Sequence, residues 1–182
     1  LDEPEMQQLE RFGIPAFLVV PNERHRMDAK IWKQRYPRLL VLAPDGAREK
    51  VEEVVRVDAS CEWDFRDPSV RIVSVPGTEQ HEAALVVSSP SGTTLVLNEL
   101  IWNLQNKPGV GGWLMKVAGF TGDSPHIPPV IGLSIKNKLA FKDQLEQWAK
   151  LYGLKRIIVS HGDIIDDNPT EVLLHLADEL AA

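Results

Sequence analysis

The sequence contains almost no cysteine: Cys61 is the single one among 182 residues. One thiol cannot form an intrachain disulfide, and it builds neither a thiolate zinc site nor a Cys-x-x-Cys redox pair. This composition predicts a reducing, cytoplasmic location.

Excess positive charge and long apolar runs are absent as well. The chain has 20 Lys and Arg against 26 Asp and Glu, a formal net charge of −6, whereas a nucleic-acid surface needs clustered cations. No apolar run reaches the length of a membrane span, and the acidic first five residues are unlike the basic start of a signal peptide. We therefore expect a small-molecule ligand, with no nucleic acid and no membrane as partner.

What the sequence does contain is the composition of an ordinary globular protein. Hydrophobic residues make up 43% of the chain and charged residues 25%. A chain of this length suits one well-buried core. We predict a single domain over residues 1–182.

Apolar periodicity predicts alternating helices and strands at the start of the chain and a β-rich middle. Helices are expected at Pro4–Phe12, through Ile31 to Arg35, after Asp45-Gly46, along Phe141–Tyr152 and from Asn168 onward. Strands are expected at Ala16–Val20, Leu39–Leu42, Val55–Val57, Val70–Val75, Ala83–Ser88, Thr93–Leu97 and Arg156–Ser160. The Gly- and Pro-rich stretch Trp102–Lys136 predicts an irregular lid or edge excursion without a long element. The pattern is that of an α/β (α+β) domain, and it fits either an αββα sandwich or a doubly wound sheet.

Polar groups that bind metals stand at the ends of three strands that are distant in sequence. His81 precedes the strand at Ala83–Ser88, Glu99 follows the strand at Thr93–Leu97, and His161 follows the last predicted strand. The polar ends of neighbouring strands share one rim of a layered fold. We therefore predict that Glu99 and His161 approach each other there.

Four segments in succession resemble the metallo-β-lactamase superfamily, specifically an uncharacterised branch of it. They are VVPNERHRMDAKIWKQRYP (residues 19–37), VPGTEQHEAALVV (75–87), TLVLNELIWN (94–103) and IIVSHGD (157–163). The branch has Pro-Asn with a nearby His and a following Trp, then an acid followed by an Asn, then His-Gly. The resemblance covers nearly the whole chain and implies a four-layer αββα sandwich. The strand pair that usually comes before these motifs is missing ahead of Leu1, so the resemblance also implies a chain that is truncated or begins late.

The resemblance implies a degenerate metal centre. The first loop of the family carries a His-x-His-x-Asp-His cluster, and Asn22, Arg24, Arg26 and Met27 stand at the corresponding positions here. Arginine does not coordinate a cation, which leaves His25 as the one possible ligand of this loop.

The later motifs agree better with the family. Thr78 replaces the histidine expected after Pro-Gly, and His81 follows three residues on. Glu99 stands at the position of the bridging aspartate, and Asn103 matches the branch pattern. His161 and Gly162 agree fully.

Two functions follow from this combination of replaced and retained family positions. In the first, one divalent ion (zinc, manganese or iron) held by His161, Glu99 and His81 or His25 serves a hydrolase of a small ester, amide, lactone or phosphoester. Asp163 or Glu99 takes the proton in that reaction.

In the second, no metal binds, and Arg24 and Arg26 form an anion-binding cleft for a carboxylate or phosphate in a binding or regulatory module. Neighbouring side chains of an extended loop point to opposite sides. His25 and the two arginines are therefore not expected to share the pocket, and we expect the arginines to face inward.

Overall fold

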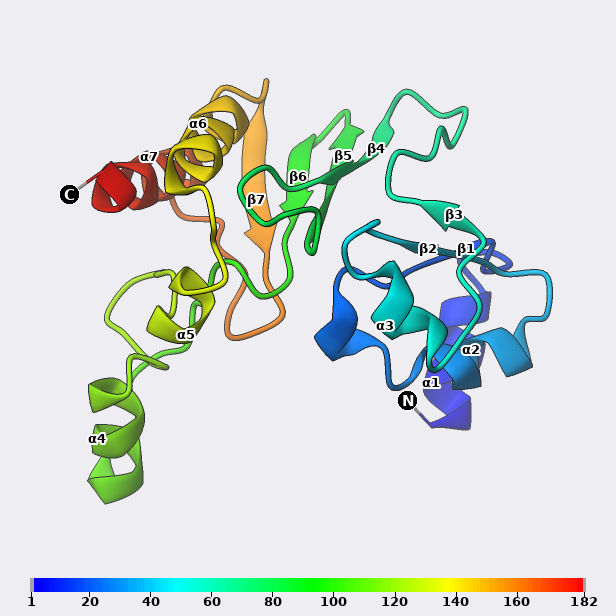
Figure 1. Ribbon diagram of the computed structural model, residues 1–182, viewed down its shortest axis with the longest axis horizontal. Coiled ribbons are helices and arrows are strands. Elements are labelled where there is room, and N and C mark those ends of the chain that lie inside the picture. Colours follow the sequence, from blue (N-terminus) through cyan, green and yellow to red (C-terminus); the bar gives the residue numbers. More distant parts are fainter. Residues whose placement is uncertain (1, 182) are drawn as a thin grey trace.

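The computed structural model describes residues 2–181 as two β-sheets with helices on their outer sides (Figure 1). The first half contains α1 (Glu3–Glu10), β1 (Phe17–Val19), the 3₁₀ turn η1 (Glu23–His25), α2 (Ala29–Arg35), β2 (Leu40–Ala43), α3 (Arg48–Glu52) and β3 (Ala59–Ser60). The second half contains β4 (Val70–Ser74), β5 (Ala83–Ser89), β6 (Gly92–Val96), α4 (Gly109–Val117), α5 (Pro129–Gly132), α6 (Lys138–Ala149), β7 (Leu154–Ile158) and α7 (Pro169–Ala181). The αββα sandwich is thereby confirmed.

The first sheet is parallel, with the strand order β1-β2-β3. Helices connect its strands, as parallel pairing requires. Its small core consists of buried Val and Ala side chains, including Val41 and Ala43 of β2 and Val51 of α3.

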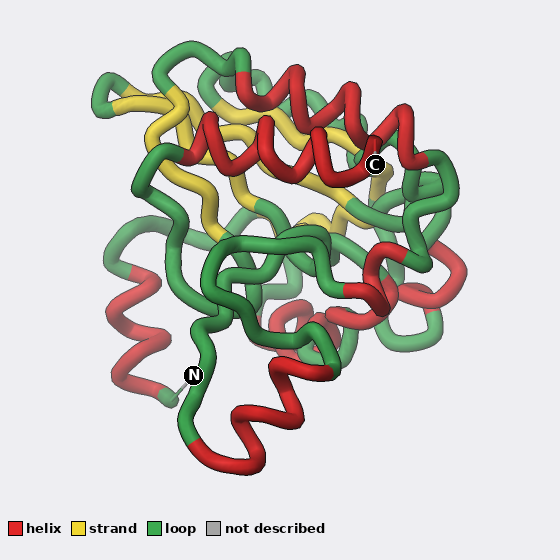
Figure 2. Tube along the Cα trace, turned by 90° about the vertical axis from the view of Figure 1, so that its left-hand side faces the viewer, coloured by secondary structure: helices red, strands yellow, loops and turns green. Residues whose placement is uncertain are grey.

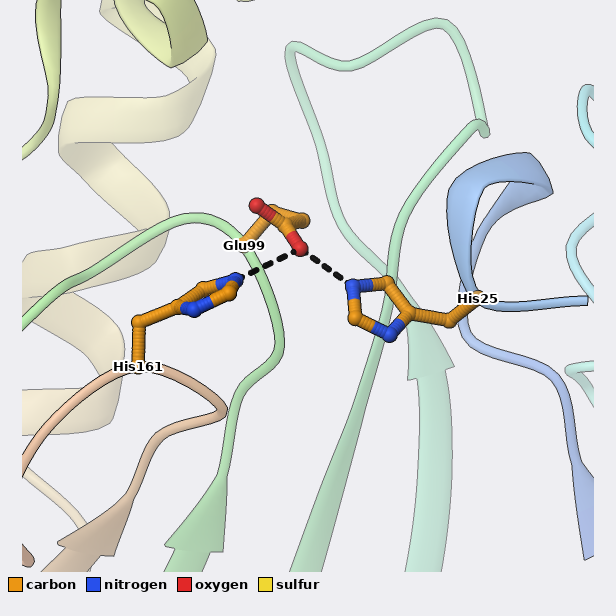
Figure 3. A group of neighbouring side chains, drawn as sticks. All are labelled: His25, Glu99 and His161. Carbon is orange, nitrogen blue, oxygen red and sulfur yellow. Dashed lines mark hydrogen bonds and ion pairs between the residues drawn. The ribbon is translucent and has the colours of Figure 1, made fainter.

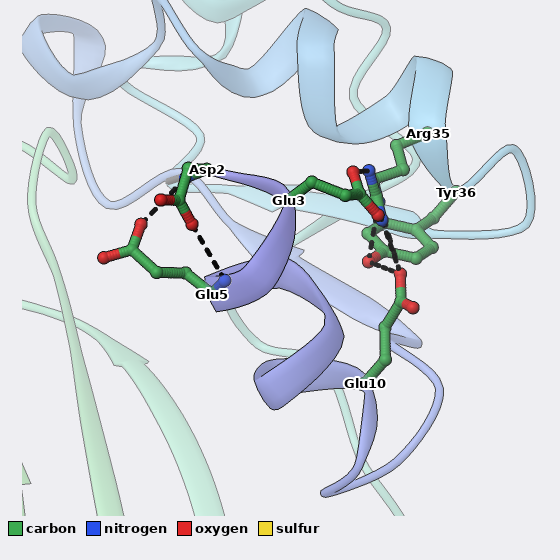
Figure 4. Close-up of polar contacts among 6 residues, drawn as sticks. All are labelled: Asp2, Glu3, Glu5, Glu10, Arg35 and Tyr36. Carbon is green, nitrogen blue, oxygen red and sulfur yellow. Dashed lines mark hydrogen bonds and ion pairs between the residues drawn. The ribbon is translucent and has the colours of Figure 1, made fainter.

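Helix α1 docks against α2 through a polar network centred on Arg35 (Figure 4). The Arg35 guanidinium forms ion pairs with Glu3 at 2.8 Å and with Glu10 at 3.1 Å. Asp2 caps α1 in a reciprocal capping box with Glu5, which satisfies backbone N–H groups that the first helical turn leaves free. The predicted N-terminal helix is confirmed, although it ends two residues before Phe12.

The second sheet has the order β4-β5-β6-β7, in which β4, β5 and β6 form an antiparallel meander and β7 lies parallel to β6. The strands predicted at Ala83–Ser88 and Thr93–Leu97 are therefore confirmed, and they pair as an antiparallel hairpin. Helices α6 and α7 lie across its outer face (Figure 2). They bury Phe141, Leu145, Trp148, Leu173 and Leu176 in the largest core of the protein.

A third apolar cluster joins the two halves. Cys61 follows β3, Ile72 lies in β4 and Ala83 begins β5, and all three are buried together against Val19 of β1. The seam between the sheets therefore runs close to the ends of β1 and β5. No helix within residues 2–181 is long and apolar enough to cross a lipid bilayer.

Several predicted elements differ from the structure. Val55–Val57 forms no strand, and the pairing with β2 occurs at Ala59–Ser60 instead. The expected helix after Gly46 shortens to the five residues of α3. Tyr152 is 97% exposed rather than part of the α6 stripe, because the helix ends at Ala149 before its side chain can face the core.

Helix α4 also contradicts the prediction of an irregular excursion. Its nine residues follow Pro108 as N-cap and bury no side chain, and the helix projects from the body of the protein (Figure 1). Leu, Met and Lys in its second half are good helix formers, whereas the three glycines of its first half are not. Trp113 of this helix is 62% exposed.

Candidate functional site

The register of two parallel strands brings Glu99 and His161 together. Val96 ends β6 and lies opposite Ile158, which ends β7. Glu99 and His161 each follow three residues after those partners, so the parallel register carries both to the same rim of the sheet. His25 reaches the same rim from the other half, as the last residue of η1 after β1.

The three side chains converge on one carboxylate oxygen (Figure 3). His161 Nε2 lies 3.0 Å from Glu99 Oε1, and His25 Nε2 contacts the same oxygen. One ligand atom from each residue lies within 4.8 Å of the other two. The prediction that Glu99 and His161 share one rim is therefore confirmed.

The cluster combines a buried acid with accessible imidazoles. The Glu99 side chain is 6% exposed, whereas those of His25 and His161 are 37% and 34% exposed. Burial alone would raise the pKa of Glu99, but the hydrogen bonds and charges of His25 and His161 outweigh burial and lower it. Glu99 is thus held as a carboxylate that accepts from both Nε2–H groups.

Asn103 and Gly162 hold the loop that carries His161. The Asn103 N–H donates to the His161 carbonyl at 2.9 Å, and its side-chain amide donates to the Asp163 carbonyl at 3.0 Å. The His161 ring also packs against Trp102, with ring centroids 4.2 Å apart. Ser160, which precedes His161, donates to the side chain of Asn98, the buried residue before Glu99.

Asn22 determines the direction of His25. Its side-chain oxygen accepts from the backbone N–H of Arg24 at 2.9 Å and of His25 at 3.1 Å. These bonds fold the segment into the 3₁₀ turn η1 rather than the extended loop that we predicted, so strict alternation of side chains does not apply.

The expected inward orientation of the arginines is wrong for Arg26. Its guanidinium donates to the Glu23 carbonyl and pairs with Glu53 at 3.1 Å. Arg24 is exposed and lines a separate pocket with Glu23 and His81. The turn instead directs His25 toward Glu99.

The structure does not bring His81 into the cluster. Its Nδ1 lies 3.3 Å from Glu23 Oε2. Thr78, at the position of the family histidine, is buried and donates its hydroxyl to the Val75 carbonyl at 2.8 Å. The carboxylate predicted to act as a base, Asp163, is exposed two residues beyond His161, and Met27 is 70% exposed.

Sequence reasoning missed Asn22 and Glu82 as supports of the site. An asparagine directly before a short turn is a recognisable cap signal. Glu82 gave no such signal, because a lone glutamate is usually a surface residue. It is 7% exposed in the structure and accepts from Asn22 Nδ2 at 2.8 Å. Burial raises the pKa of Glu82 to about 8, although the Asn22 hydrogen bond lowers it.

Comparison with solved structures identifies the fold. The chain matches VMB-1 with a TM-score of 0.58 and 14% identity, covering 100% of this chain and 78% of that one. It matches a metallo-β-lactamase from Erythrobacter litoralis with a TM-score of 0.58 and 13% identity, covering 90% and 68%. FIM-1 from Pseudomonas aeruginosa, in its mono-zinc form, has a TM-score of 0.57 and 13% identity over 98% of this chain and 75% of that chain. No protein-family model matches the sequence, and no curated protein matches it significantly in sequence.

Proposed function

We propose that this chain, which has the metallo-β-lactamase fold, is a hydrolase that uses one divalent metal ion held by His25, Glu99 and His161. One observation carries the proposal: three residues from η1 and from the ends of β6 and β7 place their ligand atoms within 4.8 Å of one another. No local sequence pattern requires that convergence, since the residues are 74 and 62 positions apart.

The donor set suits zinc. Two imidazole nitrogens and one carboxylate oxygen are the protein ligands of many catalytic zinc sites, in which a fourth position stays open for water or substrate. Manganese and iron accept the same nitrogen and oxygen donors. That FIM-1 has been solved in a mono-zinc form is consistent with a single ion in this fold.

The ion, when bound, would supply Lewis-acid chemistry and lower the pKa of water at the site. The residues of the protein balance the charge of the ion, position its ligands and accept the proton. Glu99 compensates part of the ion's charge from a buried position, and Asn103 and Asn22 hold the two histidine loops in place. We propose the exposed Asp163 as the base, because Glu99 is itself one of the proposed metal ligands.

The accessibility of the cluster supports a small-molecule substrate. About a third of each imidazole side chain faces solvent, so a small molecule can reach the open side of the cluster. We propose an ester, amide, lactone or phosphoester, because each has an oxygen that a divalent ion polarises.

The test is metal binding followed by hydrolysis. Metal-free protein titrated with zinc should bind about one equivalent, and His161→Ala and His25→Ala should bind far less, because each removes one of three ligands. His81→Ala is the matched control, since it deletes a histidine that pairs with Glu23 outside the cluster. The zinc-loaded protein should then cleave a member of a panel of chromogenic esters, lactones, amides and phosphoesters.

Two results would disprove the proposal. Binding of less than about a tenth of an equivalent would remove the metal site, because a three-ligand site retains its ion. Hydrolysis that persists undiminished in His161→Ala would show that the activity arises elsewhere.

Asp163→Asn should lower the hydrolytic rate by about 10²-fold or more while leaving zinc affinity unchanged, as removal of a general base does.

A further inference from the structure

Glu82 is buried at a position where a carboxyl group is costly. It lies directly before β5 and is 7% exposed, and Oε1 accepts one hydrogen bond from Asn22 Nδ2. Among residues 2–181, Oε2 has no hydrogen-bond partner. Burial of a polar atom without a partner costs free energy that an apolar side chain of the same size would avoid.

The single bond that Glu82 makes leads directly to the metal cluster. Asn22 is 1% exposed and uses both ends of its amide: Nδ2 donates to Glu82 and Oδ1 accepts from the backbone of Arg24 and His25. A continuous chain of hydrogen bonds therefore joins the Glu82 carboxyl to the backbone that carries the His25 ring.

This chain of bonds crosses the junction between the two halves of the protein. Asn22 belongs to the loop after β1, whereas Glu82 precedes β5 in the second sheet. Beside it, Ala83 N–H donates to the Pro21 carbonyl at 3.0 Å. His25 comes from the first half, and Glu99 and His161 come from the second, so this junction sets the distance between the ligands.

We infer that Glu82 is a positioning residue of the metal site, which holds His25 against Glu99 and His161 through Asn22. It touches none of the three proposed ligands and acts on His25 through the η1 backbone. The effect on metal affinity rests on the function proposed above, whereas the effect on the η1 backbone is independent of it.

The inference is tested with substitutions that keep the packing and remove the link. Glu82→Met preserves the length of the side chain and deletes the acceptor, and Asn22→Ser preserves a capping oxygen and deletes Nδ2. Glu82→Gln keeps an acceptor oxygen toward Asn22. Thr93→Val is the matched control, because it deletes the hydrogen bond of another buried side chain, from Thr93 to the carbonyl of the exposed Tyr152 at 2.8 Å, near the opposite end of β6.

Two measurements are made on each variant. In metal-free protein, amide hydrogen exchange at Arg24 and His25 should quicken by about tenfold in Glu82→Met and Asn22→Ser, the equivalent of one weakened hydrogen bond. Zinc affinity should fall by about 10- to 100-fold in the same two variants, as for residues that orient metal ligands. Glu82→Gln and Thr93→Val should match the unmodified protein in both measurements.

Unchanged exchange at His25 in Glu82→Met and Asn22→Ser overturns the inference. An equal loss of zinc affinity in Thr93→Val overturns it too, because the effect would then be general destabilisation. If the unmodified protein binds no zinc but exchange at His25 quickens as expected, the hydrolase proposal fails and the positioning role of Glu82 stands. If either variant fails to fold, the other decides by the same criteria.

Discussion

Gly162 sets the position of His161 although it has no side chain of its own. Its φ angle is +106°, a conformation that L side chains rarely adopt. A Cβ at this position would lie 2.1 Å from the Asn103 carbonyl oxygen. The close approach of these two backbones is what allows Asn103 to bond to both sides of the His161 loop.

We predict that Gly162→Ala displaces His161 and weakens zinc binding. The backbone has to move away from Asn103, and a strained φ costs roughly 1–3 kcal/mol of folding stability. Because the loop carries His161, a proposed zinc ligand, zinc affinity should fall by about 10- to 100-fold. Urea unfolding and a zinc competition titration measure the two effects.

Gly153→Ala provides the control for strain. Gly153 precedes β7 with a φ of +63°, and an added Cβ would meet only Gly92 Cα at 3.9 Å. This variant should lose stability by about 1–2 kcal/mol and retain full zinc affinity. Equal losses of affinity in both variants would contradict the role given to Gly162.

At the scale of elements, the ion pairs of Arg35 attach α1 to the rest of the first half (Figure 4). Hydrogen bonds from Tyr36 and Arg35, with the charge of Arg35, lower the pKa of Glu10, and the hydrogen bond and charge of Arg35 lower the pKa of Glu3. A carboxyl whose pKa is lower in the folded state contributes stability above its unfolded pKa. That contribution disappears as the pH falls through the folded pKa.

We therefore predict a pH-dependent effect of Arg35→Ala. The melting temperature of this variant should lie below that of the unmodified protein near pH 7, and the difference should shrink as the pH is lowered from about 5 to about 3. Thermal unfolding followed by circular dichroism at several pH values measures the difference.

Arg38→Ala provides the control for this prediction. Arg38 is an exposed arginine without an ion pair in the part of the chain that the structure describes. It should show little change at any pH. A deficit of Arg35→Ala that is constant from neutral to acid pH would refute the assignment to Glu3 and Glu10.

At the scale of the whole molecule, the cluster joins two halves that have separate cores. The small core of the first half and the large core around α6 and α7 meet at the seam of Cys61, Ile72 and Ala83. An ion bound by His25 from one half and by Glu99 and His161 from the other would add a further link across this seam.

We predict that zinc stabilises the folded protein. A ligand that binds only the native state adds about 2.7 kcal/mol at a free concentration 100 times its Kd. The melting temperature should rise on addition of zinc and fall again with a chelator. His161→Ala should show neither change, and an equal rise in that variant would indicate zinc bound elsewhere.

The ends of β6 and β7 show which part of the site the sequence alone predicted. Two apolar runs, one before Asn98 and one before His161, predicted two strands, and the polar residues after them predicted one rim. The structure supplies the reason that Glu99 and His161 meet: β6 and β7 are parallel neighbours in register.

The sequence alone did not predict the direction of the His25 side chain. The choice between His25 and the arginines depended on whether residues 23–25 were extended or formed a turn. The turn is stabilised by Asn22 and, through it, by Glu82, which is 60 positions away. A hydrogen bond over such a distance leaves no local pattern. For the same reason the structure was needed to exclude His81, whose partner Glu23 lies 58 positions away.

Local patterns thus predicted most of the helices and strands and the common rim of Glu99 and His161, because periodicity is a property of short segments. The choice of an αββα sandwich over a doubly wound sheet rested on the resemblance of four segments to a known superfamily. Only the tertiary structure decided which loop residue completes the cluster. That choice depends on how the two halves dock, through the apolar seam and the bond between Asn22 and Glu82. Docking is a sum of contacts between distant segments, each too weak or too far apart in the chain to be recognised alone.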